Sequence, residues 1–245
     1  MGKLIKAECL KLLRLRSYRL ILVCAAVVGV MIGYLSLNVP DYELAGEYSL
    51  KNGYNIYMSA LINIEIFMFF FLVFAVLFIC NEFSNRNFGI SLFNGCSRWR
   101  VLLAKSIVYL AGGIPVFLTI PLMAGITGTI NIGFGDVNML MWIVLIQKTL
   151  LAGLGNLSMG ALCFLLAILI KDASGTICAG IILLKAVDIS KELFGVVNLE
   201  KLTFQYQMRS LLQLDSFWMF IAVTVSTLVI SLGVSTVVFQ KTELK

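Results

Sequence analysis

The residues best suited to chemistry are charged side chains gathered in two stretches of the chain. In the first, MGKLIKAECLKLLRLRSYR at residues 1–19, Glu8 is the single acid among six lysines and arginines. In the second, NEFSNRNFGISLFNGCSRWRVLLAK at residues 81–105, Glu82 is followed by several cations. Isolated carboxylates among cations suit ionic contacts with a protein or a membrane surface. We therefore look for binding and docking in these stretches.

The usual means of catalysis are missing. The chain has no histidine, which removes the commonest general base, the commonest neutral metal ligand and the serine triads. Its six cysteines have neither CxxC spacing nor histidine partners, so they indicate no metal site and no disulfide framework. We expect no catalytic residue, no metal and no cofactor bound by this chain.

Binding of nucleotides by a phosphate loop is excluded on the same grounds. The sequence contains no GxxxxGK(S/T) motif, and the nearest spacing, GNLSMGAL at residues 155–162, lacks the lysine. No series of acids and arginines runs through the apolar segments, whereas ion-coupled carriers usually place such groups near the middle of the membrane. An ion-coupled secondary transporter is therefore disfavoured.

Composition indicates what must position these residues. Of the 245 residues, 60% are hydrophobic and 13% are charged, and the mean hydropathy is +0.97. Soluble domains have about 25% charged residues, so a soluble enzyme, a nucleic-acid binder and a disordered chain are poor interpretations. The sequence predicts an all-α integral membrane protein.

Six transmembrane helices are predicted from apolar runs of about 20 residues. The fifth is the weakest, because only 12 uncharged residues precede Lys185, and it spans only if that side chain extends to the interface. We see no repeat and no soluble segment, so residues 1–245 are expected to form one membrane domain. The predicted spans are residues 20–39, 58–80, 104–129, 147–170, 173–189 and 216–240.

Orientation follows from the lysines and arginines near the span ends. Thirteen lie on the side of the N-terminus and six on the other, so both termini are expected to be cytoplasmic. A cleaved signal peptide is the alternative for the first 40 residues. The uncharged run of 20 residues exceeds the usual 7 to 15 of a signal core, which favours an uncleaved first helix.

Residues 1–19 are predicted to form a helix along the cytoplasmic membrane surface. Lys3, Lys6, Lys11 and Arg14 fall in one arc, and the apolar residues lie largely opposite. Glu8 interrupts the apolar side, which costs membrane affinity unless a protein surface covers it. Two interpretations stay open: a topology anchor with a solvated glutamate, or contact with a partner subunit.

The loop between the second and third predicted spans has a similar pair of interpretations. Phe83, Ile90 and Phe93 lie within about 80° of one another on a helical wheel. They favour contact with a partner or a return to the membrane, although a plain positively charged hairpin also fits. Ser97 can cap the helix that begins at Arg98.

These motifs resemble a known family. The form KAExLKLxR near the N-terminus, the glutamate that leaves span two, the loop ending LxxGxSRxxxxLAK and six spans in about 250 residues look like the permease subunit of type-2 ABC exporters. The nearest resemblance is to small Gram-positive permeases linked to export of, or protection against, peptide antibiotics such as lantibiotics. The matching residues are Lys6, Ala7, Glu8, Leu10, Lys11, Leu12, Glu82, Phe83, Arg86, Asn87, Leu92, Gly95, Ser97, Arg98 and Lys105.

The resemblance implies a mechanism and partners. Two permease copies, or this chain and a similar one, would enclose the substrate route in a bacterial plasma membrane. Two copies of a separate ATPase subunit would hold ATP and Mg²⁺. The implied coupling interface comprises Lys6, Glu8, Lys11, Glu82, Phe83, Arg86, Ile90, Phe93, Ser97 and Arg98.

Glu65 is the one residue of the spans that we single out for the substrate path. It lies toward the outer end of its span, where interfacial anchoring explains it as well as contact with a cationic peptide does. A non-transporting sensor or assembly subunit remains the alternative function. The sequence decides neither the substrate, nor homodimer against heterodimer, nor immunity against secretion.

Overall fold

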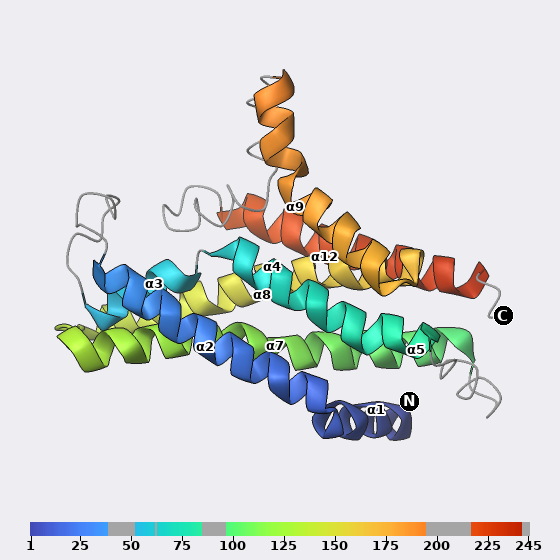
Figure 1. The fold of residues 1–245 in the computed structure, drawn as a ribbon, viewed down its shortest axis with the longest axis horizontal. Coiled ribbons are helices and arrows are strands. Elements are labelled where there is room, and N and C mark those ends of the chain that lie inside the picture. Colours follow the sequence, from blue (N-terminus) through green and yellow to red (C-terminus); the bar gives the residue numbers. More distant parts are fainter. Residues whose placement is uncertain (39–51, 62, 85–96, 195–216, 242–245) are drawn as a thin grey trace.

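The computed structural model describes residues 1–38, 52–61, 63–84, 97–194 and 217–241, and these residues form helices without strands (Figure 1). A π-helical turn at Val76–Cys80, here called the π-turn, joins α4 to α5. The α-helices are α1 (Gly2–Arg14), α2 (Arg16–Asn38), α3 (Gly53–Leu61), α4 (Ile64–Ala75), α5 (Asn81–Ser84), α7 (Arg98–Ile132), α8 (Met139–Ile170), α9 (Ala173–Phe194) and α12 (Phe217–Lys241).

Five helical segments are long and apolar enough to cross a membrane. They are Arg16–Leu37, Glu65–Ser84, Arg98–Ile132, Met139–Ile170 and Phe220–Gln240. These correspond to five of the six predicted spans, and the all-α membrane class is supported by them. The fifth predicted span, 173–189, falls on α9, whose apolar part Ala173–Leu183 is short of the roughly 20 residues that a span needs. The C-terminal part of α9 projects away from the other helices (Figure 1), so a sixth span stays a prediction.

The second predicted span, 58–80, is divided in the structure. The helix α3 ends at Leu61 and α4 begins at Ile64. Between them, Asn63 uses its amide Nδ2 to donate to the Ser59 carbonyl oxygen at 3.3 Å. Asparagine competes in this way for backbone groups that a continuous helix would use, which favours a break. The apolar run alone did not indicate this interruption.

Helix α7 lies at the centre of the bundle and packs most extensively against α2 and α3. Its approach to α2 is close because glycines line the contact: a Cβ on Gly29 would lie 2.5 Å from the Ile120 carbonyl oxygen. Toward α4, Tyr109 stacks on Phe74 with ring centroids 4.8 Å apart, and its hydroxyl donates to the Phe71 carbonyl oxygen at 2.8 Å. These contacts fix α7 against both neighbours.

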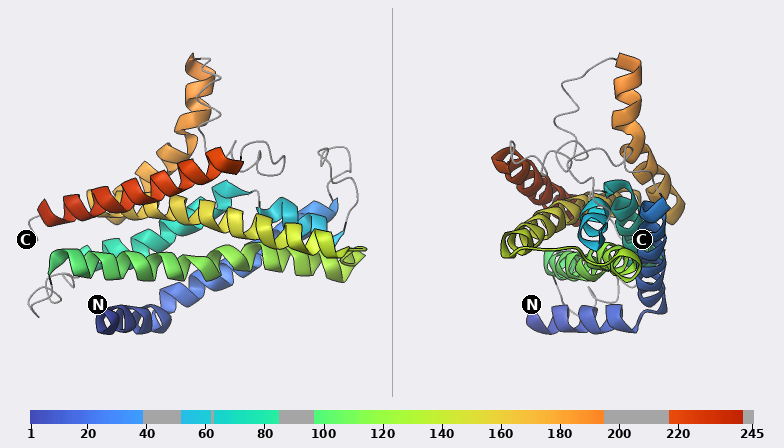
Figure 2. Two further views of the ribbon diagram at one scale, coloured as in Figure 1. Left: turned by 180° about the vertical axis from the view of Figure 1, so that it is seen from behind. Right: turned by 90° about the vertical axis from the view of Figure 1, so that its left-hand side faces the viewer.

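Helix α1 lies across the direction of the long helices. It is foreshortened in Figure 1 and runs at full length in the right-hand view of Figure 2. One extended residue, Leu15 (φ −65°, ψ 119°), separates α1 from α2 and allows the change of direction. Leu12 packs at Gly112 of α7, where an added Cβ would lie 2.6 Å from Leu12 Cδ2. The predicted surface helix is therefore present as a separate helix seated on α7.

Candidate functional site

Four charged residues from α1, α5 and α7 meet at the α1 end of the bundle. The Lys105 ammonium donates to Glu8 Oε1 at 2.8 Å and forms an ion pair with Glu82 Oε2. The Lys11 ammonium forms an ion pair with the other oxygen of the same carboxylate, Glu82 Oε1. Glu82 therefore bridges the two lysines. We call Glu8, Lys11, Glu82 and Lys105 the ion cluster.

The ion cluster is largely removed from solvent. Lys105 is 1% exposed, Glu82 4% and Glu8 7%, whereas the Lys11 side chain is 39% exposed. Two lysines and two glutamates give a formal charge of zero, which suits burial because an uncompensated buried charge costs several kcal/mol. Lys105 is thus the centre of the ion cluster, and Lys11 is its edge toward solvent.

Helical periodicity explains how α1 reaches the ion cluster. Glu8 and Leu12 are four residues apart, so they lie on the same face of α1. That face rests on α7, where Lys105 and Gly112 are seven residues, or about two turns, apart. The glutamate that interrupts the apolar side of α1 is therefore covered by a protein surface, and this surface belongs to the same chain.

Aromatic side chains form the floor of the ion cluster. The Lys105 ammonium lies 5.7 Å from the centroid of the Phe78 ring, within the range of a cation–π contact. Phe78 belongs to the π-turn and packs beside Tyr109 of α7. An apolar floor strengthens the electrostatic attraction above it, because the local dielectric constant is low.

Two carboxylate oxygens of the ion cluster accept no hydrogen bond among the described residues. Glu8 Oε2 is buried and has no hydrogen-bond partner among the described residues. Glu82 Oε2 accepts no hydrogen bond of regular geometry either, although Lys105 lies beside it as an ion-pair partner. The α1–α7 and α1–α5 contacts are therefore charged hydrogen bonds, and the α5–α7 contact is an ion pair.

The other residues of the predicted coupling interface fall into three groups. Lys6 is exposed on α1, and Ser97 and Arg98 are exposed where α7 begins. Phe83 is partly buried, with its ring centroid 6.3 Å from that of Phe239 in α12. Arg86, Ile90 and Phe93 lie outside the described residues.

The start of α7 is as the sequence predicted. Ser97 occupies the N-cap position, with extended backbone angles, but its side chain makes no capping hydrogen bond. Arg98 Nη1 donates to the Gln240 carbonyl oxygen near the end of α12 at 3.2 Å. The cationic start of α7 thus meets the C-terminal end of the last helix, where carbonyl groups present partial negative charge.

Glu65 is exposed in the first turn of α4, directly after the break at Asn63. It is separate in sequence and in secondary structure from the ion cluster. Nothing in the described residues assigns it to a substrate path, and that role stays a prediction.

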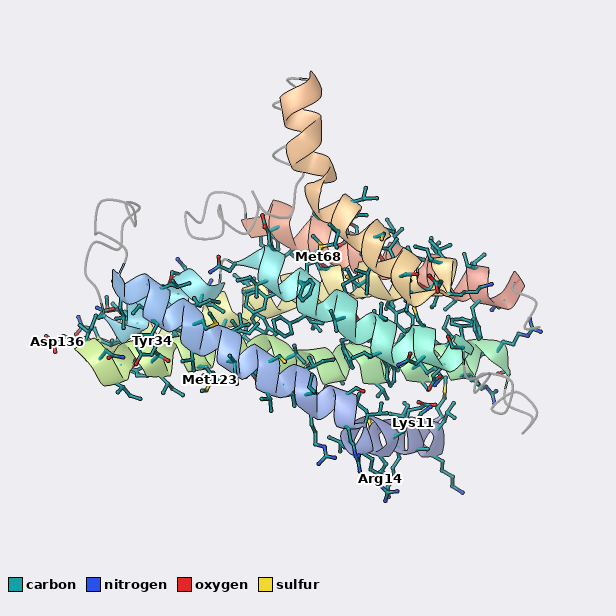
Figure 3. The ribbon with its side chains drawn as sticks, in the orientation of Figure 1. Lys11, Arg14, Tyr34, Met68, Met123 and Asp136 are labelled. Atoms are coloured by element: carbon teal, nitrogen blue, oxygen red, sulfur yellow. The ribbon has the colours of Figure 1, made fainter. Side chains whose placement is uncertain are left out.

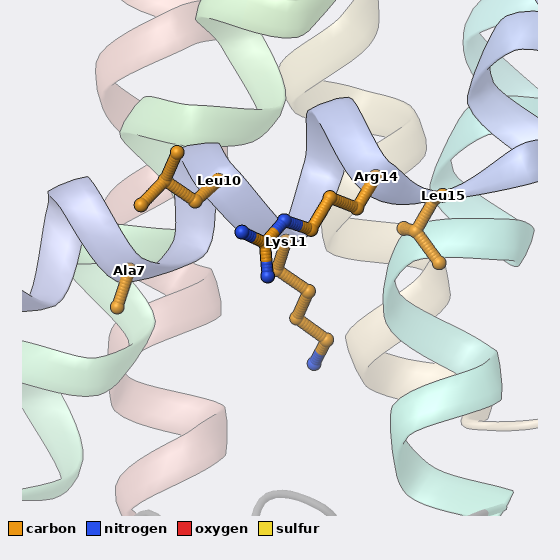
Figure 4. A pocket seen from close by; sticks show the side chains of 5 residues that line it. All are labelled: Ala7, Leu10, Lys11, Arg14 and Leu15. Atoms are coloured by element: carbon orange, nitrogen blue, oxygen red, sulfur yellow. The ribbon is translucent and has the colours of Figure 1, made fainter.

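A hollow of about 500 Å³ runs along the flank of α1 beside the ion cluster. It is lined by Ala7, Leu10, Lys11, Arg14 and Leu15, and the close view in Figure 4 shows the Arg14 guanidinium lying beside the Lys11 side chain. Because Lys11 pairs with Glu82, one residue belongs both to the ion cluster and to the wall of this hollow.

Sequence reasoning identified three of the four cluster residues but not their centre. Lys105 was part of the family motif and was not assigned to the site. A signal was available: Lys105 is the one charged residue in VLLAKSIVYL, residues 101–110, and a lysine in an apolar helix needs a partner or a route to water. The carboxylates of Glu8 and Glu82 were interpreted as facing a second subunit, whereas both also contact this buried lysine.

No protein-family model matches the chain, and a search of curated proteins found no match. The interpretation of the site therefore depends on its own geometry and on the motif resemblance. Chemically, the two carboxylates and two ammonium groups of the site are paired with one another. What it can do is fix three helices to one another through charge.

Proposed function

We propose that this chain is the membrane subunit of an ATP-driven exporter, powered by a separate ATPase subunit that binds ATP and Mg²⁺. The observation that carries the proposal is the ion cluster. It joins the surface helix α1 to α5 and α7, and residues 85–96 connect α5 to α7 in the sequence. A partner that docks at this end would therefore move three helices together.

The assembly that this proposal requires has two permease chains and two ATPase subunits. Helix α1 and the stretch 81–98 face the cytoplasm in this arrangement, and ATP-driven closure of the ATPase pair is transmitted to the spans as a rigid-body shift. A hydrophobic or amphipathic substrate, such as a peptide antibiotic, a drug or a lipid, passes outward between the two permease chains. The site of ATP hydrolysis lies in the partner, in keeping with the missing phosphate loop.

In this proposal the docking end has contact residues and supporting residues. Glu8, Glu82 and Lys105 are buried, so they support the docking end from inside. Lys6 and Arg98 are exposed cations at this end, and we assign to them a contact with an acidic partner surface. Arg14 lies at the same end, as Figure 3 shows, and Asp136 at the opposite end.

The first experiment is purification of the tagged chain from its native membrane in a mild detergent, with co-purifying proteins identified by mass spectrometry. The proposal expects a stoichiometric subunit that carries a phosphate loop. Recovery of the chain alone, under conditions that preserve a known ABC complex, would favour a sensor, an assembly subunit or an ion-coupled carrier.

Surface variants then test the docking end. Lys6→Glu together with Arg98→Glu should reduce ATPase recovery about tenfold or more, because each reversal replaces an attraction by a repulsion. Asp136→Lys is the matched control, since it reverses an exposed charge at the opposite end. Equal recovery from the double variant and the control would contradict this assignment of the docking end.

A further inference from the structure

The π-turn separates α4 from α5 within one otherwise continuous helix. A π-turn inserts one extra residue into an α-helix. Each residue of an α-helix advances the chain by about 100°, so the extra residue turns everything beyond it by roughly that angle. Glu82 is the second residue of α5, and the π-turn therefore sets the direction of its side chain.

In a regular α-helix through the same residues, Glu82 would point about 100° away from its present direction. It would then lose Lys105 and Lys11 together, because both lysines bind the same carboxylate. Lys105, 1% exposed, would keep Glu8 but lose one of its two carboxylate partners. In the full-length sequence, the closed ion cluster thus requires the π-turn.

Other side chains of the π-turn contact α9 and α7. Cys80, the last residue of the π-turn, has its Sγ 3.5 Å from Thr176 Oγ1 in α9. Phe78 lies in the aromatic stack with Phe74 and Tyr109, and it also faces the Lys105 ammonium. A π-turn is uncommon in proteins and persists where its surroundings favour it, and here those surroundings converge on Lys105.

We propose that the π-turn is a register switch between α4 and α5, and that Lys105 is the positioning residue that holds it in the π register through Glu82. When Glu82 is released, the π-turn loses its extra residue and becomes a regular α-helical turn. This change rotates α5 relative to α4. This inference rests on the proposed function only for its trigger, which is the force that the ATPase applies to the end of α5. The link between the ion cluster and the π-turn is a property of this chain alone.

Deletion of Leu77 is the decisive variant. Leu77 is the least buried residue of the π-turn, so its loss disturbs packing least. Removing one residue converts the π-turn into a regular α-helix while Glu82 still faces Lys105. The deletion therefore keeps the ion cluster and removes the switch. Leu77→Ala shortens the same side chain but keeps the extra residue, and it is the control.

The first measurement is amide hydrogen exchange of residues 78–84 in the purified chain in lipid nanodiscs, without ATPase. Glu82→Gln should speed exchange of this segment about tenfold, since the helix end is no longer held. The Leu77 deletion should slow exchange of this segment about tenfold. When Glu82→Gln is added to the deletion variant, exchange of residues 78–81 should change by less than about twofold. Exchange that is unchanged by Glu82→Gln in the full-length chain overturns the switch, even if the deletion variant does not fold.

The second measurement is substrate-stimulated ATP hydrolysis by the complete complex. The deletion should lower stimulation about tenfold without lowering ATPase recovery, whereas Leu77→Ala should keep most of it. Full stimulation in the deletion variant overturns the switch and leaves the exporter assignment intact. If hydrogen exchange responds to Glu82→Gln and to the Leu77 deletion as expected but no ATPase co-purifies, the exporter assignment fails and the switch stands.

Discussion

Glu8 and Lys105 are 97 residues apart in the sequence, yet their side chains meet at 2.8 Å in a nearly dry contact between α1 and α7. The contact seats a surface helix on the longest helix of the bundle. Because Lys105 also binds Glu82, the same ammonium decides where α5 lies. The stability of this end of the protein should therefore depend on charge balance more than on any single side chain.

Loss of the central lysine should be costly. Lys105→Met leaves Glu8 buried without a cation, and breaking a buried pair in this way typically costs about 3–5 kcal/mol. The double variant Lys105→Met with Glu8→Leu removes both charges and should recover at least half of that loss, since Glu82 keeps Lys11. Thermal unfolding in detergent measures both. A double variant no more stable than Lys105→Met would contradict the assigned pairing.

Substitution of Lys11, at the solvent edge of the ion cluster, should destabilise the protein less than substitution of Lys105. The Lys11 side chain is 39% exposed, so water replaces part of what the ion pair provides. We expect Lys11→Met to lower the free energy of unfolding by no more than about 1 kcal/mol. The same unfolding assay ranks it against Lys105→Met. A cost as large as that of Lys105→Met would mean that Lys11 is more central than its exposure indicates.

The contact between α2 and α7 should not tolerate a methyl group. A Cβ on Gly29 would lie 2.5 Å from the Ile120 carbonyl oxygen and 2.8 Å from Met123 Cβ, so the helices must separate. Gly29→Ala should lower the free energy of unfolding by about 1–3 kcal/mol, as overpacking typically does. Gly233→Ala is the control, because nothing lies within 4 Å of the added atom. Equal unfolding temperatures for the two variants would contradict this packing.

The hydroxyl of Tyr109 should contribute modestly to the free energy of unfolding. It donates to the Phe71 carbonyl oxygen at 2.8 Å in a fully buried position. Tyr109→Phe keeps the stack on Phe74 and should cost about 0.6 kcal/mol and no more than about 1.7 kcal/mol, the average and the maximum found for side-chain hydrogen bonds within membranes. Tyr109→Leu also removes the stack and should cost more. Chemical unfolding of the two variants separates the hydrogen bond from the ring.

The start of α9 gives a pH-dependent signal. Asp172 Oδ2 accepts from Ser174 Oγ at 2.5 Å and from the Gly175 N–H at 2.8 Å. These bonds lower the pKa of the Asp172 carboxyl below its ordinary value of 3.8. A lowered pKa in the folded state means stabilisation that is present above pH 3.8 and lost as pH falls through the lowered value.

The corresponding test compares the wild type with Asp172→Ala between pH 7 and pH 3. The unfolding temperature of the wild type should exceed that of the variant by a constant amount from pH 7 to about pH 5. The difference should shrink below about pH 4, where the carboxylate takes up a proton. A difference that is unchanged at pH 3 would show that the charge of Asp172 is irrelevant to the cap.

Local pattern was enough for much of the fold. Periodicity predicted α1 and placed Glu8 on its apolar side, and Ser97 marked the start of α7 correctly. These features depend on residues within one or two turns of one another. The fifth predicted span, 173–189, by contrast, depends on how Lys185 meets an interface, and the side chain of Lys185 lies outside the described residues.

The site needed information that local pattern does not hold. Lys105 pairs with Glu8, which is 97 positions away, and with Glu82, on two different helices, so only tertiary packing decides the pairing. The π-turn has no composition of its own, because VLFIC would serve equally well in an α-helix. The break at Asn63 left a weak trace, a single amide in a long apolar run, which becomes informative only when the packing of α3 on α7 is known.

Helix α7 has 35 residues and is therefore about 52 Å long, against a hydrocarbon layer of about 30 Å. It is longer than that layer is thick. Pro115, its middle residue, cannot donate a backbone hydrogen bond and allows α7 to bend there. Since α1 is seated on the half of α7 before Pro115 and α3 on the half after it, a bend at this residue changes the angle between the parts of the protein that carry α1 and α3.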